Sequence, residues 1–297
     1  MNQRCTSVSY ASGVLRWELC RAICRIGWLS VVGILVAAVS AGASSDNTLL
    51  RNATEATFAA HSAEVEFAMS LSAPGQGSYT ALELRGQEQF SAPTKAVFEV
   101  SVPTASGKTS RHFQELLDGT TLYMNPLGRW YSETSQQALA TEGLSGSLAN
   151  SSNPTDVLGF LDQQGATVKK LGRALLDGSE TTEYRSIVNL NKAAAAGTPN
   201  GIAMTPQYLH RFKRLTGKSS LTAEVWIDGA GVVRQERVTY PLSRSGLAAF
   251  GLKGAPSGIK VTMTVAFSNF GTPVVVTPPA TSQPLPTTSG LGTGRSA

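Results

Sequence analysis

Apolar and polar residues alternate along four segments of the chain, and this alternation predicts β-strands with one dry face. The first runs through residues 63–71 and places Val65, Phe67, Met69 and Leu71 on one side. Three later segments repeat the pattern, with apolar residues at Ala96, Phe98, Val100 and Val102, at Leu221, Ala223, Val225 and Ile227, and at Val261, Met263, Val265 and Phe267. Continuous Val/Ile runs, which are typical of buried parallel sheets, are missing from the sequence. The pattern therefore predicts antiparallel strands.

Asp-Gly pairs separate apolar stretches at three places: Asp118-Gly119, Asp177-Gly178 and Asp228-Gly229. Glycine accepts the positive φ that tight hairpin turns need, so each pair predicts a β-hairpin. Three such hairpins predict a meander.

Three segments have helical patterns. Apolar residues recur at helical spacing over 47–61, with Asp46 or Asn47 available as N-cap. Asn153-Pro154 and Thr205-Pro206 each combine a capping residue with a proline suited to the first turn, and they predict helices over 154–163 and 206–216. Together with the strands, these segments predict an α+β protein in which an antiparallel sheet dominates.

The two ends of the chain differ from the middle. Residues 1–43 contain a basic region, an apolar run and the small residues Ala41-Gly42-Ala43, which is the pattern of a secretory signal peptide cleaved after Ala43. The uncharged run is nearly long enough to span a bilayer, so a retained membrane anchor and a buried helix are the alternatives. Residues 278–297 are rich in Pro, Thr, Ser and Gly and predict a disordered tail. The predicted domain thus covers 44–277.

Composition narrows the class of protein further. An apolar content of 41% and a charged content of 15% are typical of a chain that buries a core. Without residues 1–43 the net charge falls from +5 to +2, because 21 basic and 19 acidic residues are left, which gives no reason to expect nucleic acid as a partner. All three cysteines precede residue 44, so the predicted mature domain has no disulfide.

No motif in the sequence supports catalysis, a cofactor or a metal. Gly107-Lys108-Thr109 and Gly217-Lys218-Ser219 lack the earlier glycine that a phosphate-binding loop needs. The histidines at 61, 112 and 210 are scattered, and no nucleophile elbow is present. The sequence predicts a non-enzymatic protein.

Several short motifs follow one another along the chain: Ser62-Ala63-Glu64-Val65-Glu66-Phe67, Asp118-Gly119-Thr120-Thr121-Leu122-Tyr123, Gly128-Arg129-Trp130-Tyr131, Asn153-Pro154-Thr155-Asp156, Gly178-Ser179-Glu180-Thr181-Thr182-Glu183-Tyr184, Glu224-Val225-Trp226-Ile227-Asp228 and Phe267-Ser268-Asn269-Phe270-Gly271. Their order resembles that in the LppX/LprG-like family of envelope lipoproteins. The resemblance covers about residues 47–277 and implies a curved antiparallel sheet, a half-barrel similar to that of the LolA/LolB carriers, wrapped around a few helices. It also implies a cavity for the acyl chains of lipids or lipoglycans, used for carriage or transfer.

The chain departs from that family at its anchor. Val39-Ser40-Ala41 resembles a lipobox, but Gly42 stands where the acylated cysteine is expected. Because glycine has no thiol to modify, we expect an extracytoplasmic protein that is secreted or held at the cell membrane by an uncleaved leader.

The alternating strands supply the predicted lining of such a cavity. The candidate ligand-binding residues are Val65, Phe67, Met69, Phe98, Val100, Val225, Ile227, Met263 and Val265. An equally simple alternative is that the same residues fill a closed core, in which case the protein is a non-enzymatic interaction or regulatory module of the envelope.

Overall fold

The alternating segments form one large β-sheet. The computed structural model describes residues 45–91, 93–103, 110–126, 128–134, 166–192, 206–249 and 257–284. The strands are β1 (Ser62–Ala73), β2 (Gly77–Gln89), β3 (Lys95–Pro103), β4 (Ser110–Asp118), β5 (Thr121–Met124), β6 (Tyr131–Thr134), β7 (Ala166–Leu176), β8 (Ser179–Asn189), β9 (Ser220–Asp228), β10 (Val233–Pro241), β11 (Lys260–Ser268) and β12 (Gln283–Pro284). The helices are α2 (Ser45–Ala59), α7 (Pro206–Thr216) and α8 (Arg244–Ala249).

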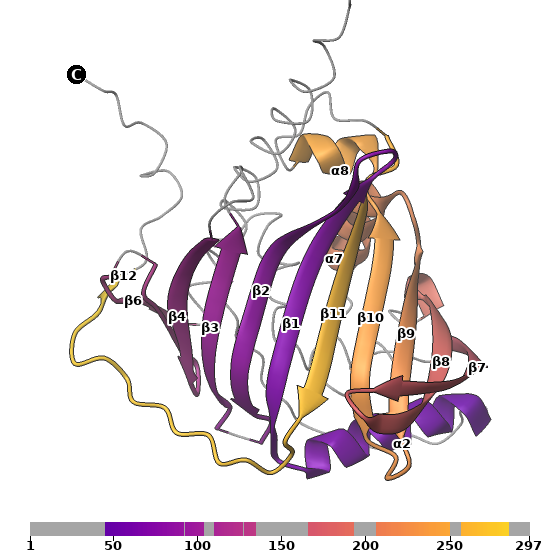
Figure 1. Ribbon diagram of the computed structural model, residues 1–297. Helices are drawn as coiled ribbons and strands as arrows, with labels where there is room; N and C mark the ends of the chain where they lie inside the picture. The colour runs from indigo at the N-terminus through magenta and orange to yellow at the C-terminus, as the bar shows by residue number, and fades with distance from the viewer. Residues whose placement is uncertain are drawn as a thin grey trace, which may run out of the picture.

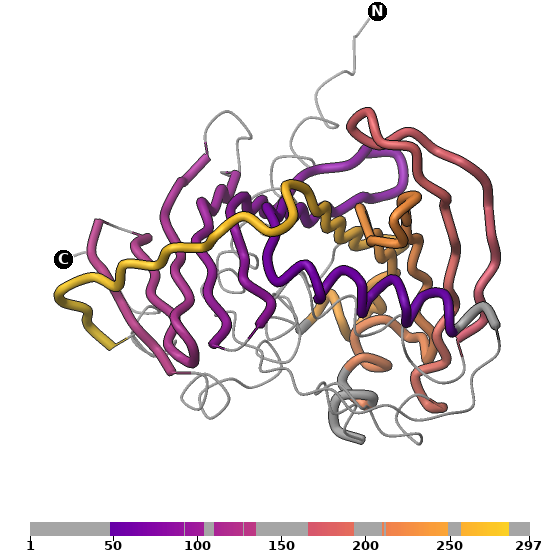
Figure 2. The backbone as a smooth tube through the Cα atoms, turned by 90° about the horizontal axis from the view of Figure 1, so that it is seen from below, coloured from indigo at the N-terminus to yellow at the C-terminus, as the bar shows by residue number. Residues whose placement is uncertain are grey.

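The sheet is built from two meanders that meet in its middle (Figure 1). Its order is β12-β6-β5-β4-β3-β2-β1-β11-β10-β9-β8-β7. Neighbouring strands are antiparallel except β12 and β6, which pair in parallel. Viewed along the strands, the sheet bends on its β7–β9 side, and α2 runs across the end of that bend (Figure 2). The predicted α+β class with a dominant, curved antiparallel sheet is confirmed.

The register places the predicted apolar residues of β1 and β11 side by side. Val65 pairs with Phe267, and Phe67 pairs with Val265. Directly opposed residues lie on the same side of a sheet, because side chains alternate between its faces. We call the side that carries Val65, Phe67, Met69 and their paired partners the inner face.

The opposite side, the outer face, carries charged residues that are in contact with water. Arg85 and Glu66 form an ion pair of 3.9 Å across β2 and β1. The Glu224 carboxylate forms ion pairs with Arg185 at 2.8 Å and with Arg237 at 3.6 Å. Such exposed pairs contribute little to stability, so the apolar inner face supplies most of the driving force for folding.

Helix α2 closes one end of the curved sheet. Leu50 and Ala53 are buried in the core, and the Thr57 hydroxyl donates to the Ala53 carbonyl at 2.7 Å. The same hydroxyl accepts the amide N–H of Val233 at 3.0 Å, which fixes the helix to the start of β10. The helix predicted over 47–61 is confirmed, with its start two residues earlier.

Helices α7 and α8 lie at the other end of the strands (Figure 1). Phe212 and Leu215 of α7 are buried, and the amide of Ser243 donates to the Leu215 carbonyl at 2.7 Å. The helix predicted over 206–216 is confirmed. The third predicted helix, over 154–163, lies outside the described residues.

All three Asp-Gly pairs lie in turns between consecutive strands, as predicted. Gly119 and Gly178 have positive φ values of 61° and 78°. In the third turn the positive φ belongs to Gly231 instead, and the Asp228 carboxylate accepts the amide of Val232 at 3.1 Å. The third hairpin therefore has a longer turn than the Asp-Gly pair alone predicts.

The ends of the chain are described only in part. The predicted leader, 1–43, lies outside the described residues, and so does 285–297. Residues 278–284 of the predicted tail are described, and they include β12, which pairs with Tyr131 and Ser132 of β6. Among the helices that the structure describes, none combines the length and the apolar character needed to span a membrane.

Candidate functional site

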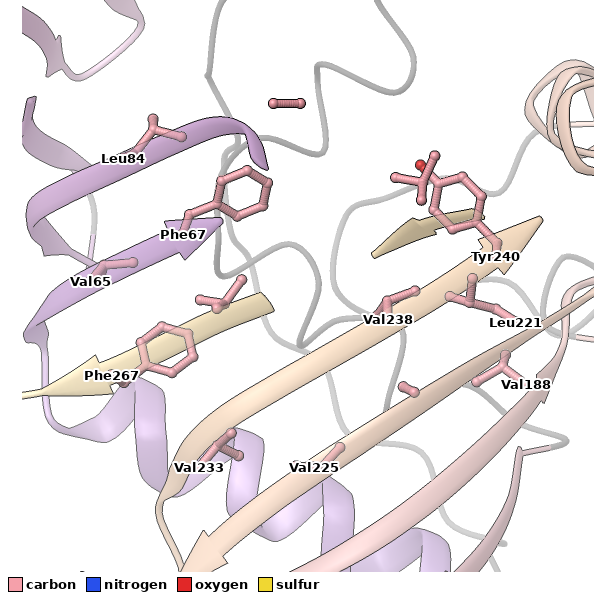
Figure 3. Packing of buried hydrophobic residues seen from close by; sticks show 14 of the residues in the cluster. Val65, Phe67, Leu84, Val188, Leu221, Val225, Val233, Val238, Tyr240 and Phe267 are labelled. Atoms are coloured by element: carbon pink, nitrogen blue, oxygen red, sulfur yellow. The ribbon is translucent and has the colours of Figure 1, made fainter. Parts of the chain in front are cut away.

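The nine candidate residues all lie on the inner face. Three come from β1, two from β3, two from β9 and two from β11, and the register carries the same face across all intervening strands. Figure 3 shows the Val65, Phe67 and Phe267 side chains on one side of the ribbon, together with Val225 and Val238. The structure thus brings together residues that are 200 positions apart in the sequence, such as Val65 and Val265.

Burial on this face changes along the strands. Val65 and Val265 are completely or almost completely buried, and Phe67 is 5% exposed. Two residues further along β1, in the next row of paired residues, Met69, Met263 and Leu82 are only half-buried, whereas Val238, which pairs with Met263, is 1% exposed. The inner face is therefore closed near α2 and less deeply buried at Met263, Met69 and Leu82, three residues that we call the Met69 row.

The inner face also carries carboxyl groups that the sequence interpretation missed. Glu236 of β10 is 1% exposed, and its direct neighbours are Val225 on β9 and Val265 on β11. Neither of its carboxyl oxygens has a hydrogen-bond partner among the residues described. Loss of solvation by burial raises the pKa of Glu236 well above its ordinary value.

Glu115 of β4 is a second carboxyl group on the same face. It lies between Phe98 on β3 and Met124 on β5, and its side chain is buried. Its Oε1 has no hydrogen-bond partner within the described part of the chain. Burial among apolar neighbours raises the pKa of Glu115 to about 7. Glu88 of β2 is also buried on this face.

The period-two pattern contains a signal for these glutamates. Val238 and Tyr240 alternate on β10, and extending that alternation backwards places Glu236 on the apolar side. An ionisable residue at a position that the alternation assigns to the buried face suggests an ion pair, a hydrogen bond or a functional role, because an unpaired buried charge lowers stability. The candidate site thus includes polar groups as well as the predicted apolar lining.

The histidines are not part of this face. His61 lies in the connection between α2 and β1 with a positive φ of 66°, His112 is exposed on β4, and His210 is exposed on α7. Within the described ranges, no group of three or more His, Cys, Asp or Glu residues is arranged to hold a metal ion.

Comparison with solved structures finds proteins of similar arrangement. LprF from Mycobacterium bovis matches over 82% of this chain and 100% of its own, at 17% identity and a TM-score of 0.45. The lipoprotein LppX from Mycobacterium tuberculosis matches over 78% and 100%, at 16% identity and a TM-score of 0.43. A LolA superfamily protein from Nitrosomonas europaea matches over 75% and 92%, at 12% identity and a TM-score of 0.28.

No protein-family model and no curated protein sequence matches the chain.

Proposed function

We propose that this is an exported cell-envelope protein that binds the acyl chains of lipids or lipoglycans on its inner face, for carriage or transfer. The observation that carries the proposal is the predominantly apolar inner face, which is buried at the α2 end and only half-buried at the Met69 row. An acyl chain enters at Met69 and Met263 and lies against Phe67, Val225 and Val265. The other proposed lining residues are Val65, Phe98, Val100 and Ile227.

The energetics suit an acyl chain. Each buried methylene contributes about 0.8 kcal/mol of favourable transfer, so a chain of about 16 carbons supplies roughly 10 kcal/mol before the costs of ordering and association. Micromolar or tighter binding follows without a charged anchor.

Replacement of Met263 by tryptophan tests this proposal. The indole fills the space beside Met69, so we expect Met263→Trp to weaken binding of a fluorescent fatty acid by about tenfold while the thermal unfolding midpoint stays close to that of the wild type. Thr264→Trp is the matched control, because Thr264 lies on the outer face of the same strand, and it should bind like the wild type. Mass spectrometry of organic extracts of the purified protein gives the cargo.

The alternative function is a non-enzymatic envelope interaction module with a closed core. It is favoured by the burial of seven of the nine candidate residues, all except Met69 and Met263. In a closed core Met263→Trp overpacks and lowers the free energy of unfolding by about 1–3 kcal/mol. That result, together with no lipid in the extract and no fatty-acid binding, contradicts the carrier proposal.

The proposed domain division is a leader, 1–43, a carrier domain, 44–277, and a tail, 278–297. With Gly42 at the position of the lipobox cysteine, we expect the mature protein to begin near Ser44 and to carry no acyl group. N-terminal sequencing and intact mass of protein from medium and envelope test this. A retained leader appears as protein that needs detergent for extraction, and an acylated N-terminus contradicts the proposal.

A further inference from the structure

Glu236 stands in a row of otherwise mostly apolar side chains. The row crosses eight strands through directly paired residues: Tyr184, Val225, Glu236, Val265, Phe67, Leu84, Val100 and Phe113. Four members are proposed lining residues of the acyl site: Phe67, Val100, Val225 and Val265. Glu236 is therefore inside that site and not at its rim.

The carboxyl group of Glu236 has no structural task that the described residues reveal. It is 1% exposed, and neither oxygen accepts or donates a hydrogen bond to any residue in the described ranges. A buried polar group without a partner costs stability, and a hydrocarbon side chain of similar size would pack there without that cost. A group that costs stability and has no partner in the fold is typical of a functional site.

The neighbours of Glu236 determine which ligand group it suits. Its direct partners in the sheet are valines. The other titratable residue in its row is Tyr184, two strands away, and Lys170 pairs with Tyr184 on the edge strand β7. No described cation lies beside it in the sheet to hold an ionised carboxylate, and burial raises the pKa of the group, which favours its neutral, protonated form. A neutral carboxylic acid both donates and accepts one hydrogen bond or more.

We propose that Glu236 recognises a hydroxyl group on the acyl chain of the cargo, so that the protein prefers hydroxylated to plain chains. This inference rests on the proposed function and adds the class of cargo to it. A hydroxyl matches the acid because it also donates and accepts, whereas a plain methylene leaves both carboxyl oxygens without partners. A carboxylate or phosphate at this depth is excluded, because it would be buried without a countercharge.

The test is competitive displacement of a fluorescent fatty acid by stearic acid and by its monohydroxylated isomers, with the hydroxyl at different positions along the chain. We expect at least one isomer to bind about tenfold more tightly than stearic acid, which is the effect of one net hydrogen bond in a buried site. If stearic acid displaces the probe and no isomer is preferred, this inference is wrong and the proposed function stands. If no chain displaces the probe, both are wrong.

Two variants assign the preference to Glu236. Glu236→Leu should lose the preference for the hydroxylated isomer and keep binding of stearic acid, with an unfolding midpoint at or above that of the wild type. Glu236→Gln keeps a donor and an acceptor and should retain the preference within about threefold. Glu66→Gln, on the exposed outer face of β1, is the matched control and should behave as the wild type.

A hydroxyl preference that survives in Glu236→Leu overturns the assignment. If Glu236→Leu also unfolds at a lower temperature than the wild type while it still prefers hydroxylated chains, the carboxyl group is structural and the assignment is wrong.

Discussion

Replacing Gly86 by alanine should unfold the protein or lower its free energy of unfolding by about 3 kcal/mol or more. Gly86 lies in β2 between Val65 of β1 and Phe98 of β3. A Cβ atom at this position collides with the carbonyl oxygen of Val97 and lies 2.8 Å from Cδ1 of Phe98. The ring of Phe98 can rotate away, but the backbone oxygen moves only with its strand.

Gly172 is the matched control for this substitution. It also lies within a strand, β7, but a Cβ atom there meets nothing within 4 Å. We expect Gly172→Ala to change the free energy of unfolding by less than about 1 kcal/mol, because the methyl group meets no atom and glycine within a strand is no more stabilising than alanine. Urea denaturation of both variants measures the difference. Equal effects of the two substitutions would contradict the close approach of the Val97 carbonyl oxygen to Gly86.

Local pattern predicted four of the strands, because each of these four has one dry face. The alternation of Val65, Phe67 and Met69 predicted β1, and similar alternation predicted β3, β9 and β11. The Asp-Gly pairs predicted the positions of three turns, since turn chemistry is local too. These features depend on residues that are neighbours in the sequence.

Long-range pairing and exceptions to the pattern were not predictable in the same way. Nothing in the sequences of β1 and β11 specifies that they pair, because many apolar strands are compatible partners. The inner-face position of Glu236 was missed because charged residues are ordinarily assigned to the wet side of a strand. The half-burial of Met69 and Met263 depends on packing in three dimensions, so the sequence left an open cavity and a closed core as alternatives.

The buried carboxyl groups should make the folded protein less stable as the pH rises from about 4.5 to about 7. The pKa of Glu115 is raised from 4.5 to about 7 in the folded state, so between these values the folded protein holds a proton that the unfolded chain has released. The stability that the protonated Glu115 carboxyl adds to the folded protein, relative to its ionised form at high pH, is fully present below pH 4.5. It is lost as the pH rises through about 7. Glu236 acts in the same direction, because burial also raises its pKa.

The size of this effect follows from the shift. For Glu115 the difference between the two pKa values corresponds to about 3 kcal/mol of unfolding free energy, which urea denaturation across this pH range measures. Glu115→Gln removes the titrating group while keeping its polarity, so its stability should fall less with pH, and the double variant with Glu236→Gln should be flatter still. Glu66→Gln, on the exposed outer face, should retain the full wild-type slope. If Glu115→Gln keeps that slope as well, the Glu115 carboxyl is solvated in the folded protein, and the apolar environment formed by Phe98 and Met124 does not exist in solution.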